Sequence, residues 1–248
     1  WRKFIDFSRN IFGKISLAMP QNTETIKYLK ILGAKKIKIT GNLKYVGKSK
    51  KNLDKNIKKL FKNRLIFCAA STHYNEELLI GKMHKELKLK YKNLLTILIP
   101  RHTNRSNSIT NELQNINLKI ITRSSKQRIS ENTDIYIVDT YGETSKFYGL
   151  SNITFLGGSL IHHGGQNPLE PARMGSYILH GPYVENFKEI YVKLSKLKVS
   201  SKINNIPSMK KIVIKKIKFK QPLKARQKLS SVGNEIFKKN LDEINKYF

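Results

Sequence analysis

The sequence predicts an α/β fold built on a doubly wound parallel sheet. Short apolar segments of strand length alternate with longer segments that have helical periodicity. The short segments are almost continuously hydrophobic, which is typical of strands that helices cover on both faces. Hydrophobic residues make up 39% of the 248 positions, enough for a sizeable core, so a disordered chain is excluded.

Helices and one short strand are expected in the amino-terminal part. Arg2–Leu17 and Thr23–Leu32 have the apolar spacing of helices, and Gly33 is a typical helix stop. Lys36–Thr40 has the length of a short strand, and Asn52–Lys62 is expected to form a basic helix.

The rest of the chain alternates strands with helices and therefore supplies the sheet. The predicted strands are Leu65–Ala70, Leu94–Ile99, Leu118–Thr122, Ile135–Asp139, Ile153–Leu156, Ser176–Leu179 and Ile212–Ile217. The predicted helices are Glu76–Tyr91, Ile109–Asn115, Ser145–Tyr148, Leu169–Met174, Phe187–Leu197 and Leu223–Tyr247.

The chain is strongly basic, with 48 Lys and Arg against 17 Asp and Glu and a net charge of +31. Such a charge attracts nucleic acid, phosphorylated ligands or an acidic membrane surface. RNA-recognition, zinc-finger and KH patterns are absent, so we do not expect nucleic acid as a partner, and lysine-rich solvated surfaces explain much of the charge. No apolar run approaches the ~18 residues of a membrane span.

Cys68 is the only cysteine, which excludes an internal disulfide and fits a reducing compartment. It lies inside an apolar segment, so we interpret it as a core residue.

Small and polar residues follow four of the predicted strands. They are Ser71-Thr72-His73, Pro100-Arg101-His102, Thr140-Tyr141-Gly142-Glu143 and Gly157-Gly158-Ser159. Because the carboxyl ends of parallel strands share one edge of the sheet, these groups are expected to surround one crevice.

A fifth segment, Asn167-Pro168-Leu169-Glu170, has the residues of a helix start, with Asn167 as the N-cap and Pro168 in the first helical position. Capping alone would explain it. A helix amino terminus also attracts phosphate, and Glu170 could hydrogen-bond a ribose diol.

In order and spacing, these motifs resemble the Kdo (3-deoxy-D-manno-octulosonic acid) transferases of lipopolysaccharide synthesis. Gly41-Asn42-Leu43-Lys44, Glu76-Glu77 and Gly164-Gly165 belong to the same series, and the resemblance runs from about residue 1 to residue 190. It implies a GT-B glycosyltransferase with Rossmann-like domains, which moves Kdo from CMP-Kdo to a lipid A precursor (lipid IVA). Inversion at the anomeric carbon, with no metal or other cofactor, is implied too.

The resemblance also implies the domain organisation. Residues 1–40 would be the remnant of an acceptor-binding domain, 41–50 a linker, 51–222 the donor-binding domain and 223–248 a carboxyl-terminal helix. The amino-terminal domain would be largely missing, together with its catalytic carboxylate. We therefore expect this chain to bind the donor nucleotide, whereas transfer needs a base from outside it.

Residue roles follow from the resemblance as expectations. CMP would contact Pro100, Arg101, Tyr141, Gly142, Glu143, Asn167, Pro168, Leu169 and Glu170. Lys44 would stabilise negative charge on the departing phosphate. The secondary candidates are Ser71, Thr72, Gly158 and Ser159.

Some alternatives remain open from the residues alone. Glu143 could cap the following helix instead of contacting the nucleotide. The adjacent His162 and His163 lack further ligands at metal spacing, so no metal site is expected. A GT-B enzyme that uses a UDP-sugar and a basic nucleic-acid-binding module are the alternative functions. The expected location is the cytoplasmic face of the bacterial inner membrane, whose anionic surface would attract the basic chain.

Overall fold

The computed structural model describes residues 1, 3–47 and 59–248. The chain divides into two compact units, residues 1–48 with 227–248 (unit 1) and residues 49–226 (unit 2). The predicted helix Asn52–Lys62 lies mostly outside the described residues. The predicted domain boundaries, drawn from the family resemblance, stay a prediction.

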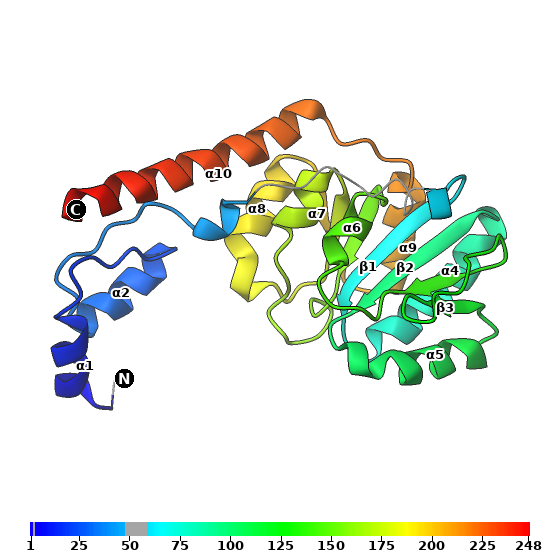
Figure 1. Cartoon of the computed structure of the whole chain (residues 1–248), viewed down its shortest axis with the longest axis horizontal. Helices are drawn as coiled ribbons and strands as arrows, with labels where there is room; N and C mark the ends of the chain where they lie inside the picture. Colours follow the sequence, from blue (N-terminus) through cyan, green and yellow to red (C-terminus); the bar gives the residue numbers. More distant parts are fainter. Residues whose placement is uncertain (2, 48–58) are drawn as a thin grey trace. The chain divides into compact units, whose positions relative to one another are not determined.

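Unit 2 is built on a parallel sheet with the strand order β3-β4-β2-β1-β5-β6-β7 (Figure 1). The strands are β1 Leu65–Thr72, β2 Leu94–Pro100, β3 Ile120–Thr122, β4 Ile135–Ile137, β5 Ile153–Leu156, β6 Tyr177–His180 and β7 Ser200–Lys202. The predicted α/β class with a doubly wound, Rossmann-like sheet is confirmed. Strand β7 was not predicted, because Ser-Ser-Lys at a sheet edge carries no apolar pattern.

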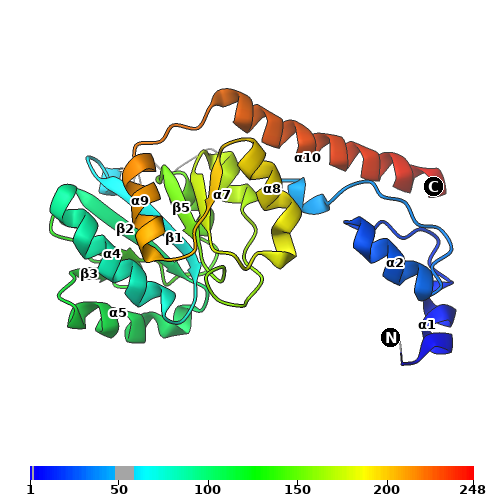
Figure 2. The ribbon, with the colours of Figure 1, turned by 180° about the vertical axis from the view of Figure 1, so that it is seen from behind.

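Helices cover both faces of this sheet. They are α4 Glu76–Lys90, α5 Ser106–Asn115, α6 Thr144–Tyr148, α7 Leu169–Met174, α8 Lys188–Lys196 and α9 Ile206–Lys216, with short 3₁₀ turns at Thr103–Arg105 and Glu185–Phe187. Figure 2 shows α4 and α9 on one side of the sheet, and Figure 1 shows α6, α7 and α8 on the other. Both strand faces are therefore buried, as their continuous apolar runs predict.

The order in which strands are added to the sheet changes direction between β1 and β5. From β1 the chain adds β2 through α4 on one side, and from β5 it adds β6 through α7 on the other. Since such crossovers are right-handed, the two sets of helices fall on opposite faces. The carboxyl ends of β1 and β5 therefore form a topological switch point, which is the usual place for a ligand in open α/β sheets.

The predicted strand Ile212–Ile217 is wrong. These residues belong to α9, which begins with a capping box between Asn205 and Ser208. Buried Met209 and Val213 lie one helical turn apart on its core face. The alternation of residues around Val213 is also typical of a strand. The capping box at Asn205 and Ser208 correctly indicates the start of a helix.

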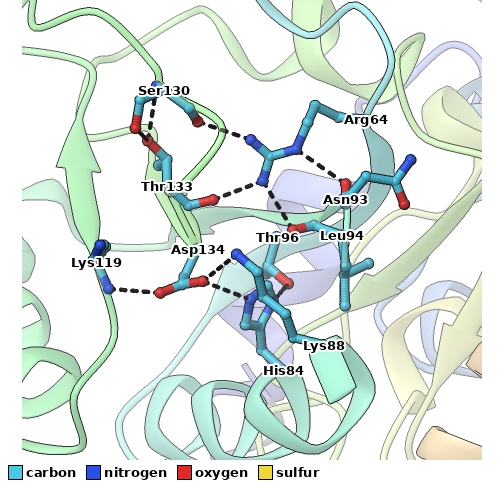
Figure 3. A network of polar contacts seen from close by, with 10 residues as sticks. All are labelled: Arg64, His84, Lys88, Asn93, Leu94, Thr96, Lys119, Ser130, Thr133 and Asp134. Atoms are coloured by element: carbon cyan, nitrogen blue, oxygen red, sulfur yellow. Dashed lines mark hydrogen bonds and ion pairs between the residues drawn. The ribbon is translucent and has the colours of Figure 1, made fainter. Parts of the chain in front are cut away.

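A polar network connects the amino ends of several strands (Figure 3). Directly before β4, Asp134 accepts hydrogen bonds from the backbone N–H of Lys119 at 2.8 Å and from the Lys88 ammonium. The carboxylate lies 3.6 Å from Nε2 of buried His84, whose Nδ1 is 2.8 Å from the Thr96 hydroxyl. Burial would raise the pKa of Asp134, but these hydrogen bonds lower it below the ordinary value.

Arg64 extends the same network from the position directly before β1. Its guanidinium donates to the backbone carbonyl oxygens of Asn93, Leu94, Ser130 and Thr133 at 2.7–3.0 Å. The amino edge of the sheet is thus a set of polar groups that hydrogen-bond one another and the backbone.

Unit 1 contains α1 Ile5–Phe12, α2 Thr23–Ile31, the 3₁₀ turns Leu43–Tyr45 and Asn245–Tyr247, and most of α10 Leu223–Ile244. The predicted helix Arg2–Leu17 is shorter than expected and ends before Gly13. The predicted strand Lys36–Thr40 is reduced to an isolated bridge between Ala18 and Ile37. Within the described residues, no helix has both the length and the apolar character needed to cross a membrane.

Candidate functional site

The strand ends of the switch point are joined by hydrogen bonds beyond the sheet. The backbone N–H of Arg101, after β2, donates to the carbonyl oxygen of Thr72 at 3.0 Å. The N–H of Gly157, after β5, donates to the carbonyl oxygen of Ala70 at 2.9 Å. The structure therefore brings the ends of β1, β2 and β5 together, as their motifs predict.

Glu76, at the start of α4, fixes two of the loops at this edge. Its side chain is almost fully buried, and its carboxylate accepts hydrogen bonds from the backbone N–H groups of His73 and Gly158, each at 2.9 Å. Burial raises the pKa of Glu76, which these donors oppose. A Cβ on Gly157 would lie 2.6 Å from its carboxylate and 2.5 Å from the carbonyl oxygen of Ser71, so only glycine fits there.

Three histidine rings meet beside Glu76. The centroid of His73 lies 4.2 Å from that of His163 and 5.9 Å from that of His102. His73 is 8% exposed, and burial together with the neighbouring cations lowers its pKa to about 4. The sequence motif around His73 does not predict this cluster, because the ring partners come from separate loops.

Two arginines near this cluster have different surroundings. Arg105 forms a two-point ion pair with fully buried Glu77, with N–O distances of 3.0 and 3.3 Å. Arg101 is exposed, and among the described residues its guanidinium has no carboxylate partner. A guanidinium that no protein carboxylate neutralises can bind an incoming anion.

Glu143, after β4, accepts hydrogen bonds from two basic side chains and one hydroxyl. Arg123 donates to both of its carboxylate oxygens, at 3.1 and 3.2 Å, and Lys146 and Thr140 also donate to it. These hydrogen bonds lower the pKa of Glu143 to about 2. It precedes α6 but makes no side-chain capping bond, so capping does not explain its position. Pairing of β3 with β4 brings Arg123 to it, a contact that sequence spacing does not reveal.

The neighbours of Glu143 are open to solvent. Tyr141 is 81% exposed, and Gly142 has a φ of +75° with open space beside it. The positive φ favours glycine here, and both residues are accessible to a ligand at this edge.

The predicted helix Leu169–Met174 is confirmed as α7, although its N-cap is Pro168 and not Asn167. The helix α7 begins at Leu169 with Pro168 as its N-cap, and Asn167 accepts a hydrogen bond from the Leu169 N–H at 3.1 Å. Asn167 therefore caps the helix start through this hydrogen bond, from the position before the N-cap. Pro168 and Leu169 are buried, whereas Asn167 and Glu170 are exposed and can be reached by a ligand.

The four secondary candidates differ in accessibility. Ser71 is partly exposed, with a φ of +54°. Thr72 and Ser159 are fully buried, and the Ser159 hydroxyl bridges the Leu156 carbonyl and the Gly181 N–H. Its bonds to the backbone give Ser159 a structural role. Gly158 has a φ of +64°, and its N–H is bound to Glu76.

Lys44 lies in unit 1, in a turn where its N–H donates to the Asn42 side chain at 2.9 Å. Its role in transfer stays a prediction, as do the predicted contacts with CMP. No group of three or more His, Cys, Asp or Glu side chains suited to a metal ion occurs among the described residues.

The chain is similar to proteins of one family over most of its length. It is 34% identical over 239 residues to the 3-deoxy-D-manno-octulosonic acid transferase of Haemophilus influenzae, which covers 94% of this chain and 55% of that protein. The chain thus spans about half the length of this curated relative. No protein-family model matches the sequence.

Solved structures give the same result. The C-terminal CMP-Kdo binding domain of WaaA from Acinetobacter baumannii matches with a TM-score of 0.62 and 29% identity, over 71% of this chain and 91% of that one. A glycosyltransferase from Rickettsia africae matches with a TM-score of 0.60 and 16% identity, over 99% of this chain and 67% of that one, which shows the fold alone. The predicted GT-B type of α/β fold is confirmed, and the chain belongs to the 3-deoxy-D-manno-octulosonic acid (Kdo) transferase family, in which it corresponds to the carboxyl-terminal part.

Proposed function

We propose that unit 2 binds CMP-Kdo and that the chain is the donor-binding part of an enzyme that transfers Kdo. The observation that carries this proposal is that exposed residues after several strands lie at the same, carboxyl edge of the sheet. Arg101, Gly142 and Glu170 follow β2, β4 and β5 at the same edge of the sheet. The similarity to a CMP-Kdo binding domain supports the same ligand.

Each group has a chemical counterpart in the nucleotide. The Arg101 guanidinium can donate two hydrogen bonds to the phosphate. The Glu170 carboxylate can accept both hydroxyl protons of the ribose diol. The backbone at Gly142 and Asn167 can contact the base, because both residues are exposed.

In the proposed reaction, a hydroxyl of a lipid A precursor (lipid IVA) attacks the anomeric carbon of Kdo. The bond from that carbon to the phosphate oxygen breaks, and its electron pair leaves with CMP. A base takes the hydroxyl proton, and we assign no base among the described residues. Arg101 counters the negative charge that develops on the phosphate, which lowers the barrier.

Calorimetry on the full chain tests donor recognition. We expect CMP to bind more tightly than UMP, because the pocket must hydrogen-bond the cytosine amine. Glu170→Ala should weaken CMP binding by about tenfold or more, the effect of losing charge-assisted hydrogen bonds. Glu189→Gln, at an exposed position of α8, is the matched control and should leave the affinity unchanged. Equal affinity for UMP, or full affinity in Glu170→Ala, would contradict the proposal.

We also propose that the protein works at the cytoplasmic face of the inner membrane. The net charge of +31 supports attraction to an anionic surface. The chain should bind phosphatidylglycerol vesicles at low salt and be released as salt screens the charges. Absence of binding at low salt would contradict this part.

A further inference from the structure

The histidine cluster, His73 with His102 and His163, has no part in the function proposed above. Its rings come from the loops that follow β1, β2 and β5. These loops meet at the switch point, so the cluster lies at the edge where the sheet is expected to bind its ligand.

His73 is held at the centre of this cluster. Its backbone N–H donates to the Glu76 carboxylate at 2.9 Å, which fixes the backbone that carries the ring. A Cβ on Gly158 would lie 3.1 Å from Nε2 of His73 and 3.3 Å from the His163 ring. The two rings therefore occupy space that the glycine leaves open, and their position is set by the fold.

The Nε2 atom of His73 is buried and has no hydrogen-bond partner among the described residues. The whole residue is only 8% exposed. A buried polar atom without a partner costs about 1–3 kcal/mol, and protein structures usually satisfy such atoms. This atom is thus a candidate for bonding to a ligand.

The charged groups that face His73 are mostly basic. From the loop after β2 come Arg101 and His102, from the following 3₁₀ turn comes Arg105, and from the loop after β5 comes His163. On α4 the two carboxylates are already engaged, Glu76 by backbone N–H groups and Glu77 by Arg105.

These surroundings determine the charge of the ring. Burial and the neighbouring cations lower the pKa of His73 to about 4, so the ring is neutral at pH 7. An anion placed between the cations would reverse this effect, because it stabilises the protonated ring.

We propose that His73 and Arg101 form an anion subsite in which Nε2–H of His73 donates to an oxygen of the donor, and that in mildly acidic solution the ring takes up a proton from solvent as the anion binds. The anion is a phosphate or a carboxylate, and CMP-Kdo offers both. In this respect the inference rests on the proposed function.

NMR titration of the His73 ring tests the subsite directly. The experiment uses the folded wild-type chain, with inorganic phosphate, CMP and free Kdo as separate probes and with His73→Gln to assign the signal. We expect the anion that binds to raise the pKa of His73 by about 1–2 units, the usual effect of an opposite charge within a few ångströms. A response to phosphate and CMP would identify the phosphate, and a response to Kdo the carboxylate.

A second measurement compares affinities at pH 5 and pH 8. If the pKa rises from about 4 to about 6, the ratio of the affinity at pH 5 to the affinity at pH 8 should be about tenfold larger in the wild-type chain than in His73→Gln. His162→Gln is the matched control, because that exposed ring contacts Tyr183 and lies outside the cluster. It should keep the wild-type pH dependence.

The failures of the two proposals are distinguishable. If CMP binds while the titration of His73 stays unchanged with all three probes, the subsite is refuted and the proposed function stands. If phosphate raises the pKa of His73 but neither CMP nor Kdo binds, the subsite is supported and the proposed function is refuted.

Discussion

The two edges of the sheet in unit 2 use polar residues in opposite ways. At the amino edge, Asp134 accepts hydrogen bonds from the Lys119 N–H and the Lys88 ammonium, and Arg64 donates to backbone carbonyl oxygens, so both side chains have their partners within the protein (Figure 3). At the carboxyl edge, Arg101 and Glu170 are exposed and Nε2 of His73 is buried without a partner.

This difference predicts which of these residues contribute to stability and which of them can bind a ligand. A buried polar group with all its partners stabilises the loops that it connects, and removing one partner leaves the others uncompensated. An exposed group at an edge without protein partners contributes little to stability and can bind a ligand. Substitutions at the two edges should therefore have different effects.

The largest effect is expected for Asp134→Ala at the amino edge. The substitution removes the acceptor for the Lys119 N–H and leaves Lys88 without its carboxylate. We expect the free energy of unfolding to fall by about 3–5 kcal/mol, the cost of breaking a largely buried ion pair. Urea unfolding measures this change, with Glu189→Gln as the exposed control.

The same variant also tests the separation of roles. The fraction that remains folded should bind CMP with the wild-type affinity, because Asp134 lies at the opposite end of the strands. A large loss of affinity in the folded fraction would mean that the two edges are coupled.

Arg105 and Arg101 offer the second comparison, within the carboxyl edge. Arg105→Met leaves the buried Glu77 carboxylate unpaired, so we expect a loss of about 2–3 kcal/mol in the free energy of unfolding. Arg101→Met should change that quantity by less than about 0.5 kcal/mol, as for other exposed side chains. For CMP affinity the order should be reversed, with a loss of about tenfold or more in Arg101→Met, measured by calorimetry. Equal effects of the two variants on stability would contradict the assignment.

The sequence predicted strands β1 to β6 because they are apolar, and small or polar residues follow four of them. Strand β7 was not predicted, and Ile212–Ile217 was assigned to a strand although it belongs to α9. Ser-Ser-Lys has no apolar pattern that would predict β7. For α9, the capping box between Asn205 and Ser208 was a better local signal than the apolar pattern.

The site was predicted less completely. Motif order placed Arg101 and Glu170 at the correct edge, since each follows a strand or starts a helix there. The roles of Glu76 and His73 were not predicted, because their partners lie tens of residues away in other loops. Only pairing of the strands brings such groups together.

The most gradual effect concerns the pH dependence of stability, because it is spread over more than two pH units. Because the pKa of His73 is about 4 in the folded chain and about 6.5 when unperturbed, the unfolded chain binds a proton first as the pH falls. The stabilisation is complete above pH 6.5 and is lost between about pH 6.5 and pH 4, with a slope of at most about 1.4 kcal/mol per pH unit from this residue. Denaturant unfolding at several pH values should show a shallower decline in His73→Gln than in the wild-type chain. His162→Gln should follow the wild type, and an unchanged slope in His73→Gln would show that the ring is protonated in the folded chain as readily as in water.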